Sequence, residues 1–168
     1  VARLTIVKFE ALIFLQMISI KPGSVPVPVL HQHLLGGVAP RPIALASTMD
    51  SEGNPNLSPY SFFNVFSANP PMAIFSPARR VRNNTTKDTY ANCKATGEVV
   101  INIVNHDIVQ QVSLSSTEYP TGTNEFIKSG LTPIQSQIVK PYRVKESPMQ
   151  LECEVRDVIE LGQEGGAG

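Results

Sequence analysis

The chain has 168 residues, enough for one compact domain with a real core and too few for two. Its 14 basic and 14 acidic side chains cancel, which argues against the broad basic surface of a nucleic-acid-binding protein. Charged residues make up only 17% of the chain and hydrophobic residues 42%, so we expect a partner, most simply a second copy, to cover part of the surface.

The first sixteen residues are apolar but contain Lys8 and Glu10, and they lack a small-residue cleavage site. They make a poor signal peptide and are too short to span a bilayer, so a cytoplasmic protein without membrane contact is expected. Because the chain opens with Val1 and Met17 begins a more ordinary sequence, residues 1–19 are interpreted as an N-terminal extension from upstream sequence or a partial gene. Residues 20–168 form the predicted domain.

The first half of the domain predicts strands separated by proline- and glycine-containing breaks. Three prolines in residues 21–30 favour an extended lead-in, and Gly36-Gly37 ends it before the first core strand. The apolar run 42–48 is followed by turn residues at 49–55 and a second strand, which indicates a hairpin. Residues 72–76 and the β-branched run 98–104 predict two further strands.

Helices are predicted between and after these strands. Residues 85–96 begin with threonines suited to an N-cap and end before Gly97, a typical stop signal. A second helix is expected over 106–114. The segment 115–130 contains proline and glycine and is predicted to be a loop with at most one helical turn.

Residues 149–161 alternate apolar and polar side chains, which predicts a long strand with one dry face. Five strands, two helices and no βαβ rhythm indicate a mainly β protein with short helices, arranged as a small Greek-key barrel. A barrel must pair its edges, and the glycine-rich residues 162–168 follow the last strand directly. We therefore expect the barrel to be truncated at the C-terminus, with at least one strand missing.

Metal and acid–base signals are weak. Cys93 and Cys153 lack metal-ligand spacing and are interpreted as core thiols rather than a disulfide. His31, His33 and His106 have no fixed spacing to a nucleophile or a paired carboxylate, so no catalytic side chain and no metal site are predicted. The turn at 162–166 is no dinucleotide fingerprint, because no helix can follow it.

A basic cluster precedes the first predicted helix. Residues 79–89 combine three arginines, Lys87, several hydroxyls and amides, and a helix N-terminus. Cations, hydroxyls and free N–H groups are what a phosphate monoester needs. The alternative is a solvated charged loop followed by an ordinary capped helix.

An aromatic run lies at the end of the predicted hairpin. Tyr60, Phe62 and Phe63 alternate with Ser58, Ser61 and Asn64, so ring surface is interleaved with small hydrogen-bonding groups. Such a surface suits a flat ring with polar edges held against a sheet. Core packing alone also explains the phenylalanines.

At these motifs the chain resembles the flavin reductase-like family of FMN-binding split-barrel proteins, which includes flavoredoxin-type proteins. The resemblance runs from about Ile20 to Gly168 through the segments 40–48, 56–63, 69–71 and 87–92. It implies a split-barrel homodimer with one FMN per subunit near the dimer interface. The residues that it places around the flavin are Ser47, Thr48, Ser58, Pro59, Tyr60, Ser61, Phe62, Phe63, Arg79, Arg80, Lys87, Asp88 and Thr89.

Within that set, Lys87 and Thr89 are expected at the phosphate. Arg41 is a candidate for the flavin edge that gains negative charge, the alternative being a salt bridge at the start of the strand. Flavin accepts hydride directly from a nicotinamide, so the predicted function needs no catalytic triad.

The leading hypothesis is an FMN-dependent oxidoreductase that takes hydride from NADH or NADPH and passes electrons to a flavin, iron or protein acceptor. One alternative is a non-enzymatic flavin-binding electron carrier. Another is an incomplete gene product that is inactive alone.

Overall fold

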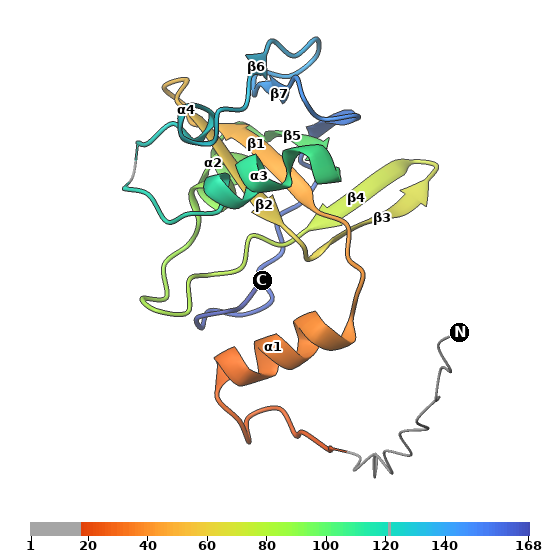
Figure 1. Ribbon diagram of the computed structural model, residues 1–168, viewed down its shortest axis with the longest axis vertical. Coiled ribbons are helices and arrows are strands. Elements are labelled where there is room, and N and C mark those ends of the chain that lie inside the picture. Colours follow the sequence, from red (N-terminus) through yellow and green to blue (C-terminus); the bar gives the residue numbers. More distant parts are fainter. Residues whose placement is uncertain (1–17, 121) are drawn as a thin grey trace, which may run out of the picture.

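The computed structural model describes residues 18–120 and 122–168, so nearly all of the predicted N-terminal extension lies outside the described residues. Its strands form one four-stranded sheet and two two-stranded ribbons, accompanied by short helices (Figure 1). In chain order the elements are α1 (Val27–Gly37), β1 (Ala44–Met49), β2 (Pro55–Tyr60), β3 (Phe63–Ala68), β4 (Pro71–Phe75), α2 (Asp88–Thr96), β5 (Glu98–Ile103), the 3-10 turn η1 (His106–Ile108), α3 (Val109–Ser115), α4 (Glu125–Ser129), β6 (Pro133–Ile134), β7 (Arg143–Val144) and β8 (Gln150–Glu154).

The four-stranded sheet has the order β2-β1-β5-β8, and all its neighbours are antiparallel. Ala44 on β1 pairs with Tyr60 on one side and with Ile103 on the other. The predicted hairpin over 42–60 and the predicted strand over 98–104 are confirmed. The turn between β1 and β2 is held by the Asp50 carboxylate, which accepts hydrogen bonds from the backbone N–H groups of Glu52 and Asn54, both at 2.9 Å.

The sheet separates two hydrophobic clusters because successive side chains of a strand point to opposite faces. One face packs against α2 and the β3–β4 ribbon, and the other against α3, α4 and the segment that contains β7. Leu45 and Leu57 are fully buried on the second face, whereas their neighbours Ala44 and Ala46 are buried on the first. The first cluster contains Ala44, Ala46, Tyr60, Phe63, Cys93, Val99 and Ile101, and the second contains Leu45, Leu57, Ile108, Val112, Phe126, Leu131 and Val144.

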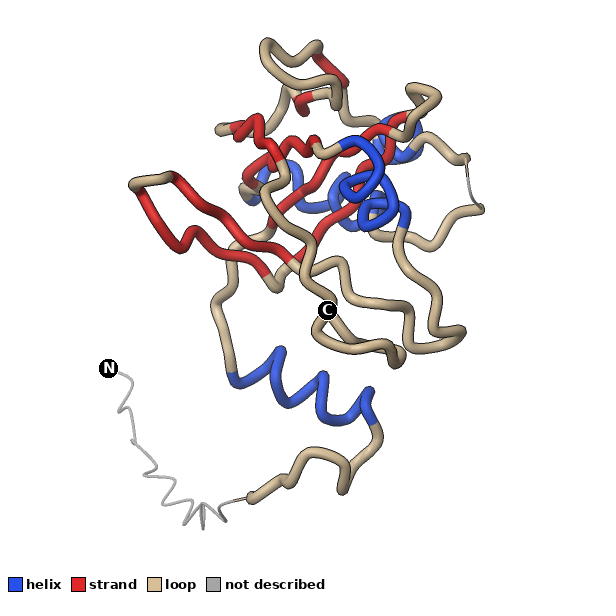
Figure 2. Tube along the Cα trace, turned by 180° about the vertical axis from the view of Figure 1, so that it is seen from behind, coloured by secondary structure: helices blue, strands red, loops and turns tan. Residues whose placement is uncertain are grey.

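The β3–β4 ribbon projects from the body of the molecule, as the view from behind shows (Figure 2). The strand predicted over 72–76 is β4, but its partner β3 was not predicted, because the aromatic run looked like a continuation of β2. The chain instead turns at Ser61-Phe62, and Phe63 pairs with Phe75. Backbone pairing leaves the ribbon separate from the four-stranded sheet, so the barrel is not closed by hydrogen bonds among the described residues.

Helix α2 begins three residues later than predicted. Thr85 does not cap it, since the Thr85 hydroxyl donates to Asn83 Oδ1 at 2.8 Å within the preceding loop. Lys87 occupies the N-cap position in an extended conformation and provides no side-chain cap. The predicted stop is confirmed: Gly97 has a φ of 72°, a left-handed conformation that glycine adopts without strain, and its N–H returns to the Cys93 carbonyl.

The extended lead-in predicted over 21–30 is wrong, because helix α1 begins at Val27. Pro26 lies at its N-cap and Pro28 in its first turn, where a missing backbone N–H costs no intrahelical hydrogen bond. None of its residues is buried. Contacts that join α1 to the body include the edge-to-face pair of His31 and Phe62, whose ring centroids are 5.8 Å apart, and the hydrogen bond from Arg41 to the Leu35 carbonyl.

The long strand predicted over 149–161 is only partly correct. β8 covers Gln150–Glu154, and its last residue lies opposite Glu98, the first residue of antiparallel β5. The next residue, Val155, donates its N–H to the Gly97 carbonyl, just before β5 starts. Beyond that point the alternation continues without a strand beside it. Ile159 and Leu161 are 69% and 79% exposed, so the periodic pattern there buries nothing in this chain.

The interpretation of both cysteines as unpaired is confirmed, with Cys93 buried and Cys153 half-buried in the same cluster. The helix predicted over 106–114 corresponds to η1 and α3, and the single turn allowed in 115–130 is α4. Within the described ranges, no helix combines the length and the apolar composition needed to cross a bilayer.

Candidate functional site

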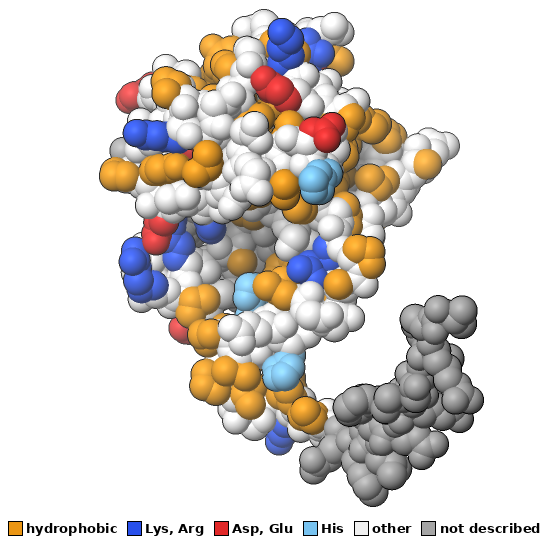
Figure 3. Space-filling view, viewed as in Figure 1, with side chains coloured by type: hydrophobic (Ala, Val, Ile, Leu, Met, Phe, Trp, Pro, Cys, Tyr) orange, Lys and Arg blue, Asp and Glu red, His pale blue; other side chains and the backbone are white. Residues whose placement is uncertain are grey.

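A cleft of about 310 Å³ lies where β2, the loop before α2 and the segment after α3 meet. In the space-filling view, basic side chains gather beside this loop at the edge of a hollow (Figure 3). The residues that line the cleft are Asn56, Ser58, Tyr60, Arg80, Val81, Arg82, Lys87, Asp88, Thr89, Ser115, Ser116, Thr117, Glu118, Tyr119 and Glu125.

Strand β2 provides one wall through its alternation. Asn56, Ser58 and Tyr60 are two residues apart, so they share a face of the strand and line the cleft. Leu57 points to the opposite face and is fully buried in the second hydrophobic cluster. The polar wall is therefore fixed by the packing of the residues between its members.

A hydrogen-bond network forms the floor of the cleft. Thr89 Oγ1 accepts from the Tyr60 phenol and from Asn56 Nδ2, both at 2.9 Å. Asn56 Nδ2 also donates to Thr48 Oγ1 at 3.0 Å, and Asn92 Nδ2 reaches the same oxygen at 3.1 Å. Strands β1 and β2 are thus joined to the first turn of α2, and burial raises the pKa of Tyr60, so its phenol stays a donor.

Lys87 supplies a cation that the protein leaves available. Its Nζ lies 5.9 Å from the centroid of the Tyr60 ring. Lys87 Nζ forms no hydrogen bond or salt bridge with any other described residue. Burial, and secondly the nearby charge of Arg80, lowers the pKa of Lys87. The carboxylates of Glu118 and Asp88 act on Lys87 through their charge but form no salt bridge with it, so the half-buried ammonium favours an anionic ligand.

Arg80 and Arg82 share one carboxylate across the cleft. Glu118 lies 3.4 Å from Arg80 Nε and 3.0 Å from Arg82 Nη2. Arg80 also donates to the Thr86 carbonyl, which holds its guanidinium in the loop. Glu118 therefore occupies the position relative to these arginines that an external anion could take.

The N-terminus of α2 adds backbone donors. The N–H groups of Tyr90 and Ala91 bond the Lys87 carbonyl, so those of Asp88 and Thr89 precede the first intrahelical bonds. The cleft also contains a half-buried acid: Glu125 Oε2 accepts from Leu57 N–H at 3.1 Å, and partial burial raises the pKa of this carboxyl. The cleft combines an available ammonium, paired arginines, hydroxyls and a helix N-terminus, a donor set suited to a phosphate.

Several predicted site residues are brought together here, although they are far apart in the chain. This set, which comes from β2, the arginine loop and the start of α2, is Ser58, Tyr60, Arg80, Lys87, Asp88 and Thr89. Thr48 lies directly behind them through its bonds to Asn56 and Asn92. The two regions that the hypothesis needs, the serine-flanked Tyr60 and the basic helix tip, share one cleft.

Other predicted residues do not line the cleft. Ser47 is fully buried on the sheet beside Leu57, and its hydroxyl has no partner among the described residues. Phe63 belongs to the first hydrophobic cluster, which confirms the core-packing alternative for this side chain. Phe62 is 38% exposed and contacts His31 of α1, because the chain turns before β3.

The remaining predicted residues have structural partners elsewhere. Pro59 lies opposite Leu45 in the β1–β2 ladder. Arg79 turns back on its own loop, where Nε donates to Asn84 Oδ1 at 2.8 Å. Arg41 donates to the carbonyls of Leu35 and Val38 at the end of α1, and Ser61 Oγ accepts from Arg41 Nε at 3.4 Å. Among the described residues Arg41 forms no salt bridge, and these hydrogen bonds fasten the end of α1 to the β2–β3 corner.

Sequence reasoning missed the wall that follows α3. Glu118, Tyr119 and Glu125 were read as loop, as were the hydroxyl residues 115–117. The run of serines and threonines at 113–117 was a usable signal, because it repeats the donor chemistry of the basic cluster. Asn56 was also missed, although it continues the alternation of Ser58 and Tyr60.

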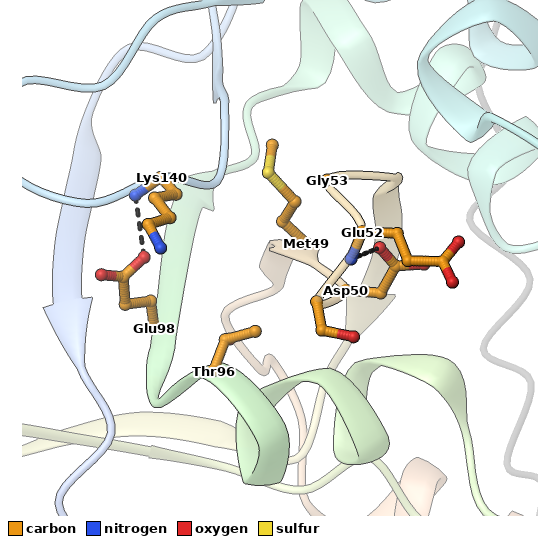
Figure 4. Close-up of a pocket in the computed structure, with 8 residues that line it drawn as sticks. Met49, Asp50, Glu52, Gly53, Thr96, Glu98 and Lys140 are labelled. Carbon is orange, nitrogen blue, oxygen red and sulfur yellow. Dashed lines mark hydrogen bonds between the residues drawn. The ribbon is translucent and has the colours of Figure 1, made fainter.

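A second hollow of about 290 Å³ lies beside the β1–β2 turn (Figure 4). Two of its carboxylates have partners: Asp50 holds its own turn, and Glu98 Oε2 accepts from Lys140 N–H at 2.9 Å. In the part of the chain that the structure describes, no group of three or more metal-ligating side chains is found. Lys140 is the single lysine or arginine among its lining residues, so the hollow lacks the cluster of cations found in the first cleft.

Comparison with known proteins shows the family of this chain. The model of the flavin reductase like domain family matches residues 36–165. The chain belongs to this family. The predicted fold class, mainly β with short helices on a split-barrel plan, is thereby confirmed, and membership supports a flavin-dependent oxidoreductase.

Individual relatives are similar over most of the chain. A protein of Aquifex aeolicus without an assigned function is 40% identical over 126 residues, which are 75% of this chain and 64% of the relative. Nitrilotriacetate monooxygenase component B from Bacillus cereus is 31% identical with a TM-score of 0.83, covering 90% of this chain and 75% of that one. A flavin reductase candidate with a split barrel domain from Shewanella frigidimarina is 27% identical with a TM-score of 0.68, covering 84% and 69%. The chain thus spans less than two thirds of the Aquifex relative.

Proposed function

We propose that the chain is an FMN-dependent oxidoreductase that takes hydride from NADH or NADPH and passes electrons to a flavin, iron or protein acceptor. One observation carries the proposal. In a domain of the flavin reductase-like family, the available ammonium of Lys87, the guanidinium of Arg80 and the N-terminus of α2 converge on the polar face of β2.

The donor set fits the phosphorylated end of FMN. Lys87 and Arg80 would neutralise the phosphate, and the backbone N–H groups of Asp88 and Thr89 would donate to its oxygens. Ser58 adds a hydroxyl on the strand side. The carboxylates of Asp88 and Glu118 would repel the phosphate. In the complex, the Asp88 side chain must therefore point away from it, and Glu118 must release its salt bridges to Arg80 and Arg82.

For the ring system the cleft offers the Tyr60 side chain and the network behind it, whereas Phe62 and Phe63 lie elsewhere. When bound, FMN supplies the capacity to accept hydride from a reduced nicotinamide. The roles left to this chain are to bind the phosphate, hold the floor rigid through Tyr60 and Thr89, and keep β2 in register. None of these roles needs an acid–base pair.

A homodimer forms part of the proposal. Val65, Phe66 and Ile74 on the projecting β3–β4 ribbon are 58%, 66% and 57% exposed (Figure 2). Three large apolar side chains exposed on one small projecting ribbon support contact with a second copy, which would remove them from water. Gel filtration combined with light scattering tests this: a monomer at micromolar concentration would contradict it.

The decisive test of the function is spectroscopic. The purified protein is mixed with FMN, and binding is followed by flavin fluorescence and by the melting temperature. NADH or NADPH is then added without oxygen while the absorbance of the flavin is recorded. Rapid bleaching supports a reductase, and slow bleaching of a tightly bound flavin supports the electron carrier. If FMN neither changes its fluorescence nor raises the melting temperature, the proposal is wrong.

A further inference from the structure

Two segments far apart in the chain lie side by side next to the cleft. They are the arginine loop, residues 79–86, and the glycine turn, residues 162–167, and both ribbon views show them adjacent near the C-terminus (Figures 1 and 2). Arg79 N–H donates to the Ala167 carbonyl at 2.8 Å, and Gly166 N–H donates to the Arg79 carbonyl at 3.0 Å. Asn84 Nδ2 donates to the Gln163 carbonyl at 2.9 Å.

The approach is close enough to require glycine at position 165. A Cβ added to Gly165 would lie 3.0 Å from both the Cα and the carbonyl oxygen of Val81, and 3.3 Å from the Arg80 carbonyl oxygen. All three atoms belong to the backbone, so no side-chain rotation can relieve the contact. A larger residue must push the arginine loop away from the turn.

The arginine loop would respond as a unit because it is bonded to itself. Arg80 N–H donates to the Thr85 carbonyl, and Asn84 N–H donates to the Arg80 carbonyl, both at 2.9 Å. Asn84 has a left-handed backbone conformation, with a φ of 54°, and its Oδ1 accepts a hydrogen bond from Arg79 Nε. A displacement at Val81 is therefore passed to Arg80 and Arg82, the two cleft residues that flank it.

We infer that the glycine turn positions the arginine loop for anion binding, and that Gly165 sets the distance between them. The anion's identity as the FMN phosphate rests on the function proposed above. Gly165 is not among the residues that line the cleft, so it acts through Val81 and Arg80 as a positioning residue. The turn, which has no use as a dinucleotide fingerprint, gains a role as a support for phosphate recognition.

The test compares FMN with riboflavin, which lacks the phosphate. Gly165→Ala is expected to weaken FMN binding about tenfold, the loss of one charge-assisted hydrogen bond, while riboflavin affinity changes less than about twofold. Gly162→Ala is the matched control in the same turn, because its Cβ would meet only the Ala167 side chain, at 3.2 Å. A merely structural role for Gly165 predicts equal losses for both ligands, and that result overturns the inference.

A second variant decides the matter if Gly165→Ala does not fold. Asn84→Gly tolerates the same positive φ but removes the bond to Gln163 and the bond from Arg79 Nε, while Arg79 Nη2 keeps its bond to the carbonyl of residue 84. It is expected to weaken FMN binding selectively, and an unchanged ratio of FMN to riboflavin affinity contradicts the inference.

Inorganic pyrophosphate, measured by its effect on melting temperature, separates this inference from the proposed function. If pyrophosphate raises the melting temperature but FMN does not bind, the proposed flavin function is wrong. The anion site is then tested by the effect of Gly165→Ala and Asn84→Gly on pyrophosphate binding. Binding of neither ligand by the unaltered protein overturns both.

Discussion

Tyr60 on β2 and Thr89 in the first turn of α2 are joined by a buried hydrogen bond of 2.9 Å from phenol to hydroxyl oxygen. The bond fastens the helix that carries the cations to the strand that forms the polar wall. Both side chains line the cleft, so the contact that stabilises the fold there also shapes the proposed site.

Tyr60→Phe removes this bond and keeps the ring. The free energy of unfolding is expected to fall by about 1 kcal/mol, the usual net contribution of such a bond, since Thr89 retains its bond from Asn56. Urea denaturation measures the change. Tyr142→Phe is the control, because the Tyr142 hydroxyl bonds no other described residue at hydrogen-bond distance while its ring packs on Phe126. Equal losses in the two variants would remove the special role of the Tyr60 phenol.

Lys87→Ala is expected to weaken FMN binding by about 1 to 3 kcal/mol, the size of a hydrogen bond to a charged group. Burial lowers the pKa of Lys87, so its ammonium loses its proton at a lower pH than an ordinary lysine does. As the pH is raised, the FMN affinity of the unaltered protein should therefore begin to fall earlier than it would with an ordinary lysine. Fluorescence titration measures both effects. Lys94→Ala, which removes an exposed charge from the same helix, is the control. Unchanged FMN affinity in Lys87→Ala excludes this residue from the site.

Glu118→Gln tests whether the protein's own carboxylate competes with the ligand. Removing its charge frees Arg80 and Arg82, so FMN should bind more tightly at low ionic strength. The gain should be at most about fivefold, since exposed ion pairs contribute about 0 to 1 kcal/mol. High salt should reduce the gain through screening. Glu160→Gln, which loses a pair with Lys94, is the control. Weaker binding in Glu118→Gln would show that Glu118 supports the ligand instead.

Glu125 predicts a pH dependence of stability. Burial raises the pKa of its carboxyl above the ordinary 4.5, so the folded state binds the proton more tightly than the unfolded state. The stabilisation that comes from this tighter proton binding is complete below the ordinary pKa, and it is lost as the pH rises through the raised pKa of the folded state. Glu125→Gln should therefore raise the melting temperature at neutral pH and not at acidic pH, since the amide oxygen can still accept from Leu57 N–H.

Glu152 supplies the opposite sign for comparison. Hydrogen bonds from the N–H groups of Gln137 and then Ile138 lower the pKa of Glu152, so its stabilisation is present above the ordinary pKa and lost on acidification. Glu152→Gln should lower the melting temperature at neutral pH. If Glu125→Gln and Glu152→Gln shift the melting temperature in the same direction at neutral pH, the opposite pKa shifts of these two carboxyls are contradicted.

Cys93 should be unreactive in the folded protein. Burial raises the pKa of its thiol to about 11, so almost no thiolate forms at neutral pH. Iodoacetamide labelling followed by mass spectrometry should modify Cys93 only after unfolding, with the urea-unfolded chain as the control. Rapid labelling of Cys93 in the native protein would contradict its burial.

Local patterns in the chain determined the elements whose signals are short-range. The turn residues at 49–55, the β-branched run at 98–104 and Gly97 each act within a few neighbours, and the structure has the hairpin, the strand and the helix end that they predict. Alternation alone misled beyond Val155, because a strand also needs a partner, and antiparallel β5, which starts at Glu98 opposite Glu154, does not extend that far. Proline misled at 21–30, since the first turn of a helix tolerates it.

The basic cluster and the hydroxyl-bearing aromatic run were visible in the sequence by themselves, with the chemistry that a phosphate and a ring require. Only the tertiary structure decided which members meet. It retained Tyr60 and Lys87 but turned Phe62 toward α1 and buried Phe63 in the core. The bonds that assemble the cleft join residues 29 positions apart, as for Tyr60 and Thr89, and 68 apart, as for Leu57 and Glu125. Such contacts depend on how the sheet and helices pack, and no periodicity within one segment encodes them.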